Sequence, residues 1–227
     1  MNSPQVDPTR AGFADRTLAD IATTLPGATA VFRSAKLDYC CGGGAVLRNA
    51  AAARQSDLGQ LVAKLEALAA TAAPTAAPQD VEALIAAIET RFHQTHRREL
   101  PELIRLARRV EAVHRDVPSV PAGLANLLDR IQMELESHMQ KEEQVLFPLM
   151  RQGGHPGIGM PIRMMRGEHD DHGAHLRALE ALTNDFTPPP EACTTWRALY
   201  AGTRKFANDL VDHIHTENNT LFPRFDV

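Results

Sequence analysis

The feature that most constrains the fold of this chain is a motif that occurs twice with identical spacing. The pattern His-x-x-x-Glu-x-x-x-Leu-Phe-Pro occupies residues 138–148 and again residues 213–223. Residues four apart lie on one face of an α-helix, about one turn from each other. Apolar residues recur on the same face of each segment, so we expect two helices that direct a histidine and a glutamate into a core.

These buried pairs predict a metal centre. A glutamate in a core costs several kcal/mol unless a cation compensates its charge, and this chain places two of them in the same register. Two more helical segments each contribute one histidine on an apolar face. The predicted ligands are His93, His138, Glu142, His169, His213 and Glu217.

The ligand types favour a pair of first-row metals. Imidazole and carboxylate ligands suit iron, whereas a single tetrahedral zinc would leave part of this ligand set unused. If both carboxylates and an oxygen atom bridge two six-coordinate metals, about two coordination positions stay open. A centre of this kind could bind or react with a small molecule.

Several other polar residues lie near the predicted ligands in the sequence. Glu134 and Asp209 each precede a ligand histidine by four residues, which suits either orientation of the imidazole, proton relay or ordinary ion pairing. His172 lies beside His169 on its helix, and Glu168 is expected at the rim of the site. For His96 and His172 a core or groove position is favoured over a supporting role. We expect surface positions for His114, Glu143, His155 and His215.

Composition narrows the class of protein. A chain of 227 residues with 44% hydrophobic content can bury a sizeable core, and a net charge of -4 offers no basic surface for nucleic acid or a membrane. The N-terminus lacks the apolar stretch of an export signal, and no later segment is long and apolar enough to span a bilayer. With only three cysteines, these features predict a cytoplasmic protein whose thiols are reduced.

The periodic segments predict an all-α protein with two parts. Residues 71–78 contain two prolines and no charge, which is typical of a linker between a small helical domain (1–70) and an up-down four-helix bundle (79–227). Because this linker has little to bury, the small domain is expected to swing between the bundle and a partner. Helices are expected at 17–24, 27–34, 45–54 and 57–70, then at 79–114, 122–151, 161–184 and 194–219.

Cys40 and Cys41 precede three glycines and a predicted helix. Thiols close to the positive end of a helix dipole have a lowered pKa, so the pair is interpreted as reactive, with a glycine-rich turn carrying incidental cysteines as the alternative. Cys193 opens a helix after three prolines and is interpreted as structural or incidental.

The combined motifs resemble a known family. The bundle is similar to hemerythrin-like domains, and the whole pattern resembles the Repair of Iron Centres proteins, from residue 17 to 225. That resemblance implies two irons per chain, iron ligands at the six positions above, an N-terminal domain with vicinal cysteines, and repair of iron–sulfur clusters damaged by nitric oxide or oxidants. The motifs that carry it are Asp38-Tyr-Cys-Cys-Gly-Gly43, His93-x-x-His-Arg97, His138-Met-x-Lys-Glu-Glu143, Glu168-His-Asp170 and His213-Ile-x-x-Glu-Asn-Asn219.

The chain departs from oxygen-carrying hemerythrins at Gly173, where those proteins have a second histidine on the third helix. This weakens the case for an oxygen carrier and widens access to one metal. From the resemblance we expect iron donation to damaged iron–sulfur proteins, with cysteines that accept or pass on iron, electrons or a nitrosyl group. The alternatives are a di-iron enzyme that reduces nitric oxide or peroxide, and a reversible sensor of a diatomic gas. Client proteins, redox state and oligomeric state, including a homodimer, are left open by the sequence.

Overall fold

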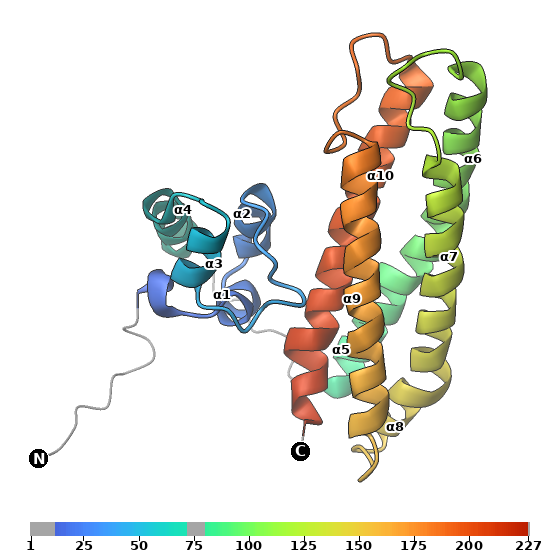
Figure 1. The fold of residues 1–227 in the computed structure, drawn as a ribbon. Coiled ribbons are helices and arrows are strands. Elements are labelled where there is room, and N and C mark those ends of the chain that lie inside the picture. Colours follow the sequence, from blue (N-terminus) through green and yellow to red (C-terminus); the bar gives the residue numbers. More distant parts are fainter. Residues whose placement is uncertain (1–11, 72–79, 227) are drawn as a thin grey trace, which may run out of the picture.

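The structure is a computed structural model that describes residues 12–71 and 80–226. Within these ranges the chain forms helices and no strand, apart from one isolated bridge between Thr17 and Val46. The all-α prediction is therefore confirmed. Figure 1 shows a small group of short helices beside a long bundle, with one loop of the small group reaching the bundle at α9 and α10.

The small group is built from four short α-helices and one 3-10 turn around its own core. Thr17 caps the first helix by accepting a hydrogen bond from the amide of Asp20, and Gly27 supplies the positive φ of +87° before the second. Ile21, Phe32 and Leu65 are fully buried in the core. The elements are η2 (Phe13–Asp15), α1 (Leu18–Thr24), α2 (Ala28–Ser34), α3 (Leu47–Ala53) and α4 (Leu58–Thr71).

Four long helical stretches form the bundle, and they alternate in direction (Figure 1). Each expected helix is present, with ends that differ by a few residues. The first stretch is α5 (Val81–Ala87), η3 (Ile88–His93) and α6 (Gln94–Val113), and the second is α7 (Leu124–Lys141), η4 (Glu142–Leu146) and α8 (Phe147–Arg151). The third is α9 (Gly159–Leu182), and the fourth is α10 (Thr194–Thr216), η5 (Glu217–Leu221) and η6 (Phe222–Arg224).

Three of the four stretches contain a π-helical turn at the position of a candidate ligand. Segment η3 ends at His93, η4 begins at Glu142 and η5 begins at Glu217. Single π turns inside α-helices occur frequently at functional sites. Pro148 and Pro223, which close the repeated motif, lie directly after two of these turns and have no N–H to donate to the preceding turn. The repeat therefore marks a local backbone feature as well as a pair of side chains.

The bundle core is divided by a polar layer. One apolar cluster includes Leu100, Leu135 and Leu210, and another includes Phe92 and Phe147. Along the helices, the candidate ligands lie between residues of these two clusters. None of the helices within residues 12–71 and 80–226 is both long and apolar enough to cross a bilayer.

The small group is docked against α10 in this structure. Arg33 Nη1 donates to Asp212 Oδ1 at 2.7 Å, and the hydroxyl of Tyr39 donates to the same oxygen at 2.8 Å. Val211 packs against the cores of both the bundle and the small group. We expected a small domain that does not dock firmly, whereas polar contacts from α2 and its following loop hold it on the bundle. Of the predicted linker 71–78, residues 72–78 lie outside the described part of the chain.

Candidate metal centre

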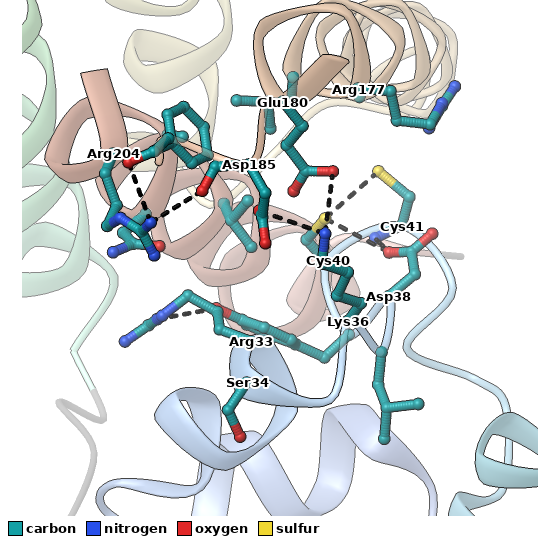
Figure 2. A pocket seen from close by; sticks show the side chains of 18 of the residues that line it. Arg33, Ser34, Lys36, Asp38, Cys40, Cys41, Arg177, Glu180, Asp185 and Arg204 are labelled. Carbon is teal, nitrogen blue, oxygen red and sulfur yellow. Dashed lines mark hydrogen bonds and ion pairs between the residues drawn. The ribbon is translucent and has the colours of Figure 1, made fainter. Parts of the chain in front are cut away.

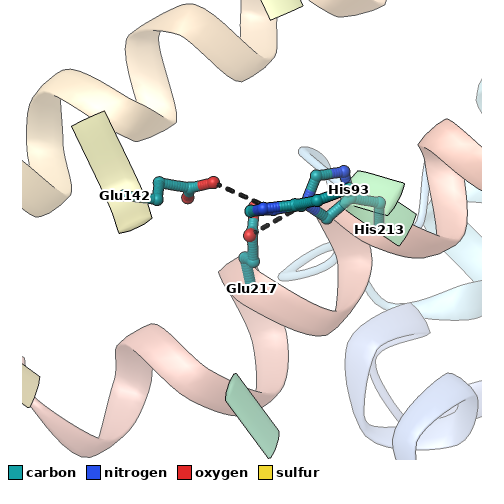
Figure 3. A group of neighbouring side chains, drawn as sticks. All are labelled: His93, Glu142, His213 and Glu217. Carbon is teal, nitrogen blue, oxygen red and sulfur yellow. Dashed lines mark hydrogen bonds and ion pairs between the residues drawn. The ribbon is translucent and has the colours of Figure 1, made fainter. Parts of the chain in front are cut away.

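The structure brings six residues from four helical stretches together in the polar layer. Their donor atoms form two clusters, each within 4.8 Å, and both clusters contain the same two glutamates. Figure 3 shows one of the clusters, with the carboxylate of Glu142 directed at His93. One cluster contains His93, Glu142, His213 and Glu217, and the other contains His138, Glu142, His169 and Glu217.

The imidazoles meet through their Nε2 atoms. These atoms are 3.1 Å apart for His93 and His213, and 3.2 Å apart for His138 and His169. The carboxylates complete the clusters: Glu142 Oε2 lies 3.4 Å from His93 Nε2 and 3.5 Å from His138 Nε2. Glu217 divides its oxygens, with Oε1 at 3.0 Å from His213 Nε2 and Oε2 at 3.1 Å from His169 Nε2. Glu142 and Glu217 therefore each contact histidines of both clusters.

The donor set fits a bound cation. All six side chains are buried, and both oxygens of Glu142 and one oxygen of Glu217 make no hydrogen bond. Burial raises the pKa of Glu142, and the nearby charge of Glu217 raises it further. An unpaired buried carboxylate is costly unless a positive charge compensates it, so a cation held by these clusters would account for the orphan oxygens.

Hydrogen bonds on the outer side fix the orientation of three imidazoles. Nδ1 of His93 donates to Glu143 Oε1 at 2.7 Å, and Nδ1 of His138 donates to Glu168 Oε2 at 2.9 Å. Nδ1–H donation leaves the Nε2 lone pair free for a metal. The Nε2 lone pairs of His138 and His169, whose nitrogen atoms are 3.2 Å apart, would repel one another without a cation between them. This again favours a metal in the clusters.

Asn218 is the acceptor for the third of these imidazoles. Its Oδ1 accepts from His169 Nδ1 at 2.9 Å. Sequence reasoning did not assign Asn218 a role, although its position next to Glu217 in the motif was a usable signal. Glu143 was expected on the surface, but it is only partly exposed and is shared between His93 and Arg97, whose Nη1 donates to it at 2.7 Å.

Two residues predicted as candidates for orienting ligands or relaying protons contact other groups. Glu134 Oε2 lies 3.4 Å from His175 Nδ1, and Asp209 accepts a hydrogen bond from Lys205 at 2.8 Å. Their four-residue spacing places them one turn from His138 and His213, yet their side chains contact these other groups. The structure therefore favours ordinary ion pairing for Asp209, while Glu134 belongs to a separate group of histidines.

The remaining histidines divide between core and surface. His96 is buried beside His213, and His172 is buried against the ring of His138, with centroids 5.4 and 5.2 Å apart respectively. Burial, together with the charge of nearby His138, lowers the pKa of His172 to about 3. His155 is exposed, while His114 is half-buried against Trp196. The surface position expected for His215 is wrong.

His215 is buried because the small group covers it. Its Nδ1 atom lies 3.3 Å from the carbonyl oxygen of Tyr39 and 3.0 Å from Asn219 Nδ2. Its ring also contacts the Tyr39 ring at a centroid distance of 5.3 Å. A helical wheel correctly turns His215 away from the ligands, but it contains no information about the domain that packs on that face.

Comparison with known proteins agrees with this geometry. Residues 84–225 match the Hemerythrin HHE cation binding domain, and residues 14–69 match the ScdA_N domain, described as a domain of unknown function. The chain is 47% identical to the iron-sulfur cluster repair protein YtfE of Dickeya chrysanthemi, with 93% of this chain and 97% of that protein covered. This chain belongs to the family of iron–sulfur cluster repair proteins.

Two further relatives support the assignment. The YtfE protein of Escherichia coli O139:H28 is 46% identical, and a probable iron-sulfur cluster repair protein of Haemophilus influenzae is 43% identical. Each alignment covers 93% of this chain and 97% of the relative. In this member of the repair family, similarity therefore extends across both the small helical group and the bundle.

The cysteine loop of this repair-family chain lies against the candidate metal centre. Asn218 Nδ2 donates to the carbonyl oxygen of Cys40 at 3.2 Å, while its Oδ1 accepts from His169. Cys41 Sγ lies 3.9 Å from the carbonyl oxygen of His169. One amide side chain thus joins the backbone of the cysteine loop to a candidate ligand.

The two cysteines do not lie at a helix N-terminus, contrary to expectation. Helix α3 begins only at Leu47, and Cys40 is buried. Its pKa is raised by the hydrogen bond with Cys41, by burial and by the charge of Asp38. Gly43 instead allows the cysteine loop to pack closely against Asn219, since a Cβ at Gly43 would lie 2.8 Å from both Asn219 Oδ1 and the Tyr39 carbonyl oxygen.

A cavity of about 830 Å³ opens between the small group and the bundle (Figure 2). Both cysteines line it, as do Gly173 and Arg177 from α9. Cys41 is exposed, whereas Cys40 is almost fully covered. The cavity therefore gives a small molecule or a partner's side chain access to the thiols on the side of the loop that faces α9.

Substitution of Asn218 should separate its two contacts. We expect Asn218→Ala to weaken metal binding about 10–100-fold, as is typical when an outer hydrogen-bond partner of a ligand is lost. Asn218→Asp keeps the acceptor for His169 but removes the donor to Cys40, so it should retain most of the metal affinity and loosen the loop. Competition with a chelator measures the first effect, and amide exchange at residues 38–44 the second. Asn208→Ala, in the same cavity, is the control and should change neither.

Proposed function

We propose that this chain is a cytoplasmic di-iron protein that helps repair iron–sulfur clusters damaged by nitrosative or oxidative stress, by donating iron. The observation that carries the proposal is the juxtaposition of two elements: two buried clusters that share both carboxylates, and a two-cysteine loop that Asn218 links by hydrogen bonds to the candidate ligand His169. The names of the relatives, all iron-sulfur cluster repair proteins, supply the biological process.

The proposed ligands for one iron are His93 and His213, and those for the other are His138 and His169, with Glu142 and Glu217 shared. When bound, the two irons and an oxygen bridge would supply exchangeable metal and redox chemistry. The protein's part is to hold the six side chains in register, to exclude water with the two apolar clusters, and to keep three imidazoles oriented through their Nδ1–H groups.

We also propose a division of labour between residues 1–70 and residues 79–227, joined by the linker 71–78. All six candidate ligands lie in the second part, whereas the paired thiols lie in the first. The docked loop places Cys41 against the backbone of His169, where a thiolate could receive iron leaving the centre or accept a nitrosyl group. Partners in this scheme are damaged iron–sulfur proteins, which would approach the exposed face of Cys41.

A di-iron enzyme that reduces nitric oxide, or a sensor of a diatomic gas, is the second candidate function. The observation that favours it is the position of Gly173, one turn after His169 and on the wall of the cavity. Multiple turnover with an electron donor would identify an enzyme, because an iron donor loses metal as it acts. A sensor would give a reversible, stoichiometric spectral change without turnover.

Gly173→His tests whether small ligands reach the centre on this side. An added Cβ meets only Arg177 Nη1, at 3.5 Å, so the side chain has room at its base, and an imidazole four residues after His169 can reach toward the same iron. We expect unchanged iron content and at least tenfold weaker binding of azide or nitric oxide, measured by optical titration. Gly173→Ala is the control. Equal ligand affinity in a fully loaded histidine variant would place the open position elsewhere.

A further inference from the structure

A third group of potential ligands lies beside the two clusters, between α7 and α9. Glu134 on α7 and His172 and His175 on α9 place their donor atoms within 4.8 Å of one another. Glu134 precedes His138 by four residues on its helix, and His172 follows His169 by three on the neighbouring, antiparallel helix. The group therefore occupies the next turn along the same helix–helix contact as the proposed di-iron centre.

His172 is buried without a hydrogen-bond partner. It is 2% exposed, and neither Nδ1 nor Nε2 makes a hydrogen bond. Nδ1 of His175 also has no hydrogen bond and lies 3.4 Å from Glu134 Oε2. Leaving buried polar nitrogens unpaired costs free energy comparable to lost hydrogen bonds, so the geometry calls for a partner that the protein itself does not supply.

The composition of the group indicates which partner. Two imidazoles and one carboxylate form the facial set that binds ferrous iron with several coordination positions open. Calcium and magnesium require oxygen ligands, and a structural zinc site would need a fourth protein ligand. A divalent first-row metal with exchangeable water ligands fits best.

The three residues also form a gradient of exposure. The His172 ring is buried and its centroid lies 5.2 Å from the His138 ring. The side chain of His175 is 16% exposed, and that of Glu134 is 45% exposed. The group thus extends from a candidate di-iron ligand to solvent, on a side of α9 separate from the cavity that the cysteines line.

We propose that Glu134, His172 and His175 form a mononuclear divalent-metal site, suited to ferrous iron, that lies on the route between solvent and the di-iron centre. Metal binding at this site stands on the geometry alone. Its role in binding iron on the way to the di-iron centre rests on the proposed di-iron function. Because it has only three protein ligands and its outermost ligand, Glu134, is open to solvent, the site binds metal more weakly than the buried clusters and exchanges it faster.

The test is a titration of the di-iron protein with cobalt(II) under anaerobic conditions, followed by its visible absorption. We expect one further equivalent to bind while the iron content, measured by elemental analysis, stays constant. Glu134→Gln and His175→Ala should each weaken cobalt binding at least tenfold. Glu102→Gln and His155→Ala are matched controls on exposed residues, and they should bind cobalt as the wild type does.

A second measurement addresses the role in iron transfer. Reloading of the metal-free protein with ferrous iron should be slower in Glu134→Gln and His175→Ala, with the same final iron content as the wild type. Binding of no further cobalt by the wild type, or equal cobalt binding in these variants and the controls, would overturn the site. If Glu134→Gln and His175→Ala lose cobalt binding but load iron at the wild-type rate, the role of the site in iron transfer would be overturned. Repair by the wild type is assayed separately, so failure of the proposed function is recognised independently.

Discussion

Glu142→Gln combined with Glu217→Gln should leave the protein with almost no bound iron, against the two irons per chain that we propose for the wild type. Each of these carboxylates belongs to both ligand clusters, so removing their charges takes away the shared ligands and the charge compensation of both proposed irons at once. Glutamine keeps the shape of the side chain, which separates loss of charge from loss of packing. Elemental analysis after expression in iron-rich medium measures the effect, and Glu102→Gln, at an exposed ion pair with Arg105, is the control.

The single substitution Glu142→Gln should have opposite effects on the stability of the loaded and metal-free proteins. Because burial raises the pKa of Glu142, the metal-free protein is most favoured when this group is protonated, below its unfolded pKa of about 4.3, and loses stability as the pH rises through the folded value. Glutamine removes that loss. At neutral pH we expect the metal-free variant to melt a few degrees higher than the metal-free wild type, since 1 kcal/mol corresponds to roughly 2–4 °C in a chain of this size.

With iron bound, the same variant should melt lower, because a charged ligand is missing. Calorimetry of both forms at pH 7 and near pH 4.5 gives the comparison, and the gain in the metal-free form should shrink at the lower pH. Undiminished iron in the double variant, or a metal-free single variant that is less stable than the metal-free wild type, would show that the buried carboxylates are not metal bridges of the kind proposed.

The second large effect is expected from Cys40→Ser with Cys41→Ser. This variant should retain both irons and their spectrum, but it should no longer restore activity to an iron–sulfur enzyme damaged by nitric oxide. The thiols are outside both ligand clusters, so the centre does not need them, whereas Cys41 lies at the exposed end of the loop against His169. Serine preserves the size of the side chains and hence the docking of the loop.

The single substitutions Cys40→Ser and Cys41→Ser should differ in their effect on repair. Cys40 is buried, and its pKa is raised by the hydrogen bond with Cys41 and by burial. It therefore remains a thiol at neutral pH and donates a hydrogen bond to the sulfur of Cys41. Most of the loss should therefore appear in Cys41→Ser alone. Cys193→Ser is the matched control, since Cys193 is exposed beside His114 and distant from the loop in the sequence. Full repair by the double variant would reduce Cys40 and Cys41 to incidental residues of a glycine-rich turn.

The sequence by itself was sufficient to predict the helical bundle and to predict that the six candidate ligands meet inside it. A period of 3.6 residues fixes which side chains share a helix face, and a histidine and a glutamate four residues apart remain adjacent however the helix packs. The repeat of this pair at residues 138–142 and 213–217 indicated two equivalent helices, and burial of the carboxylates indicated a cation between them. Those inferences depend on local geometry alone.

Only the tertiary structure decided which groups surround the ligands. Glu143 and Asn218 face Nδ1 atoms of His93 and His169 on other helices, and Glu134 faces His175 in place of His138. Such pairings depend on the rotation and offset of one helix against another, which spacing within a single helix does not fix. For the same reason His215 was misplaced, because a separate group of helices buries it, and the contacts of Arg33, Tyr39 and Val211 at this junction leave no periodic pattern in the sequence.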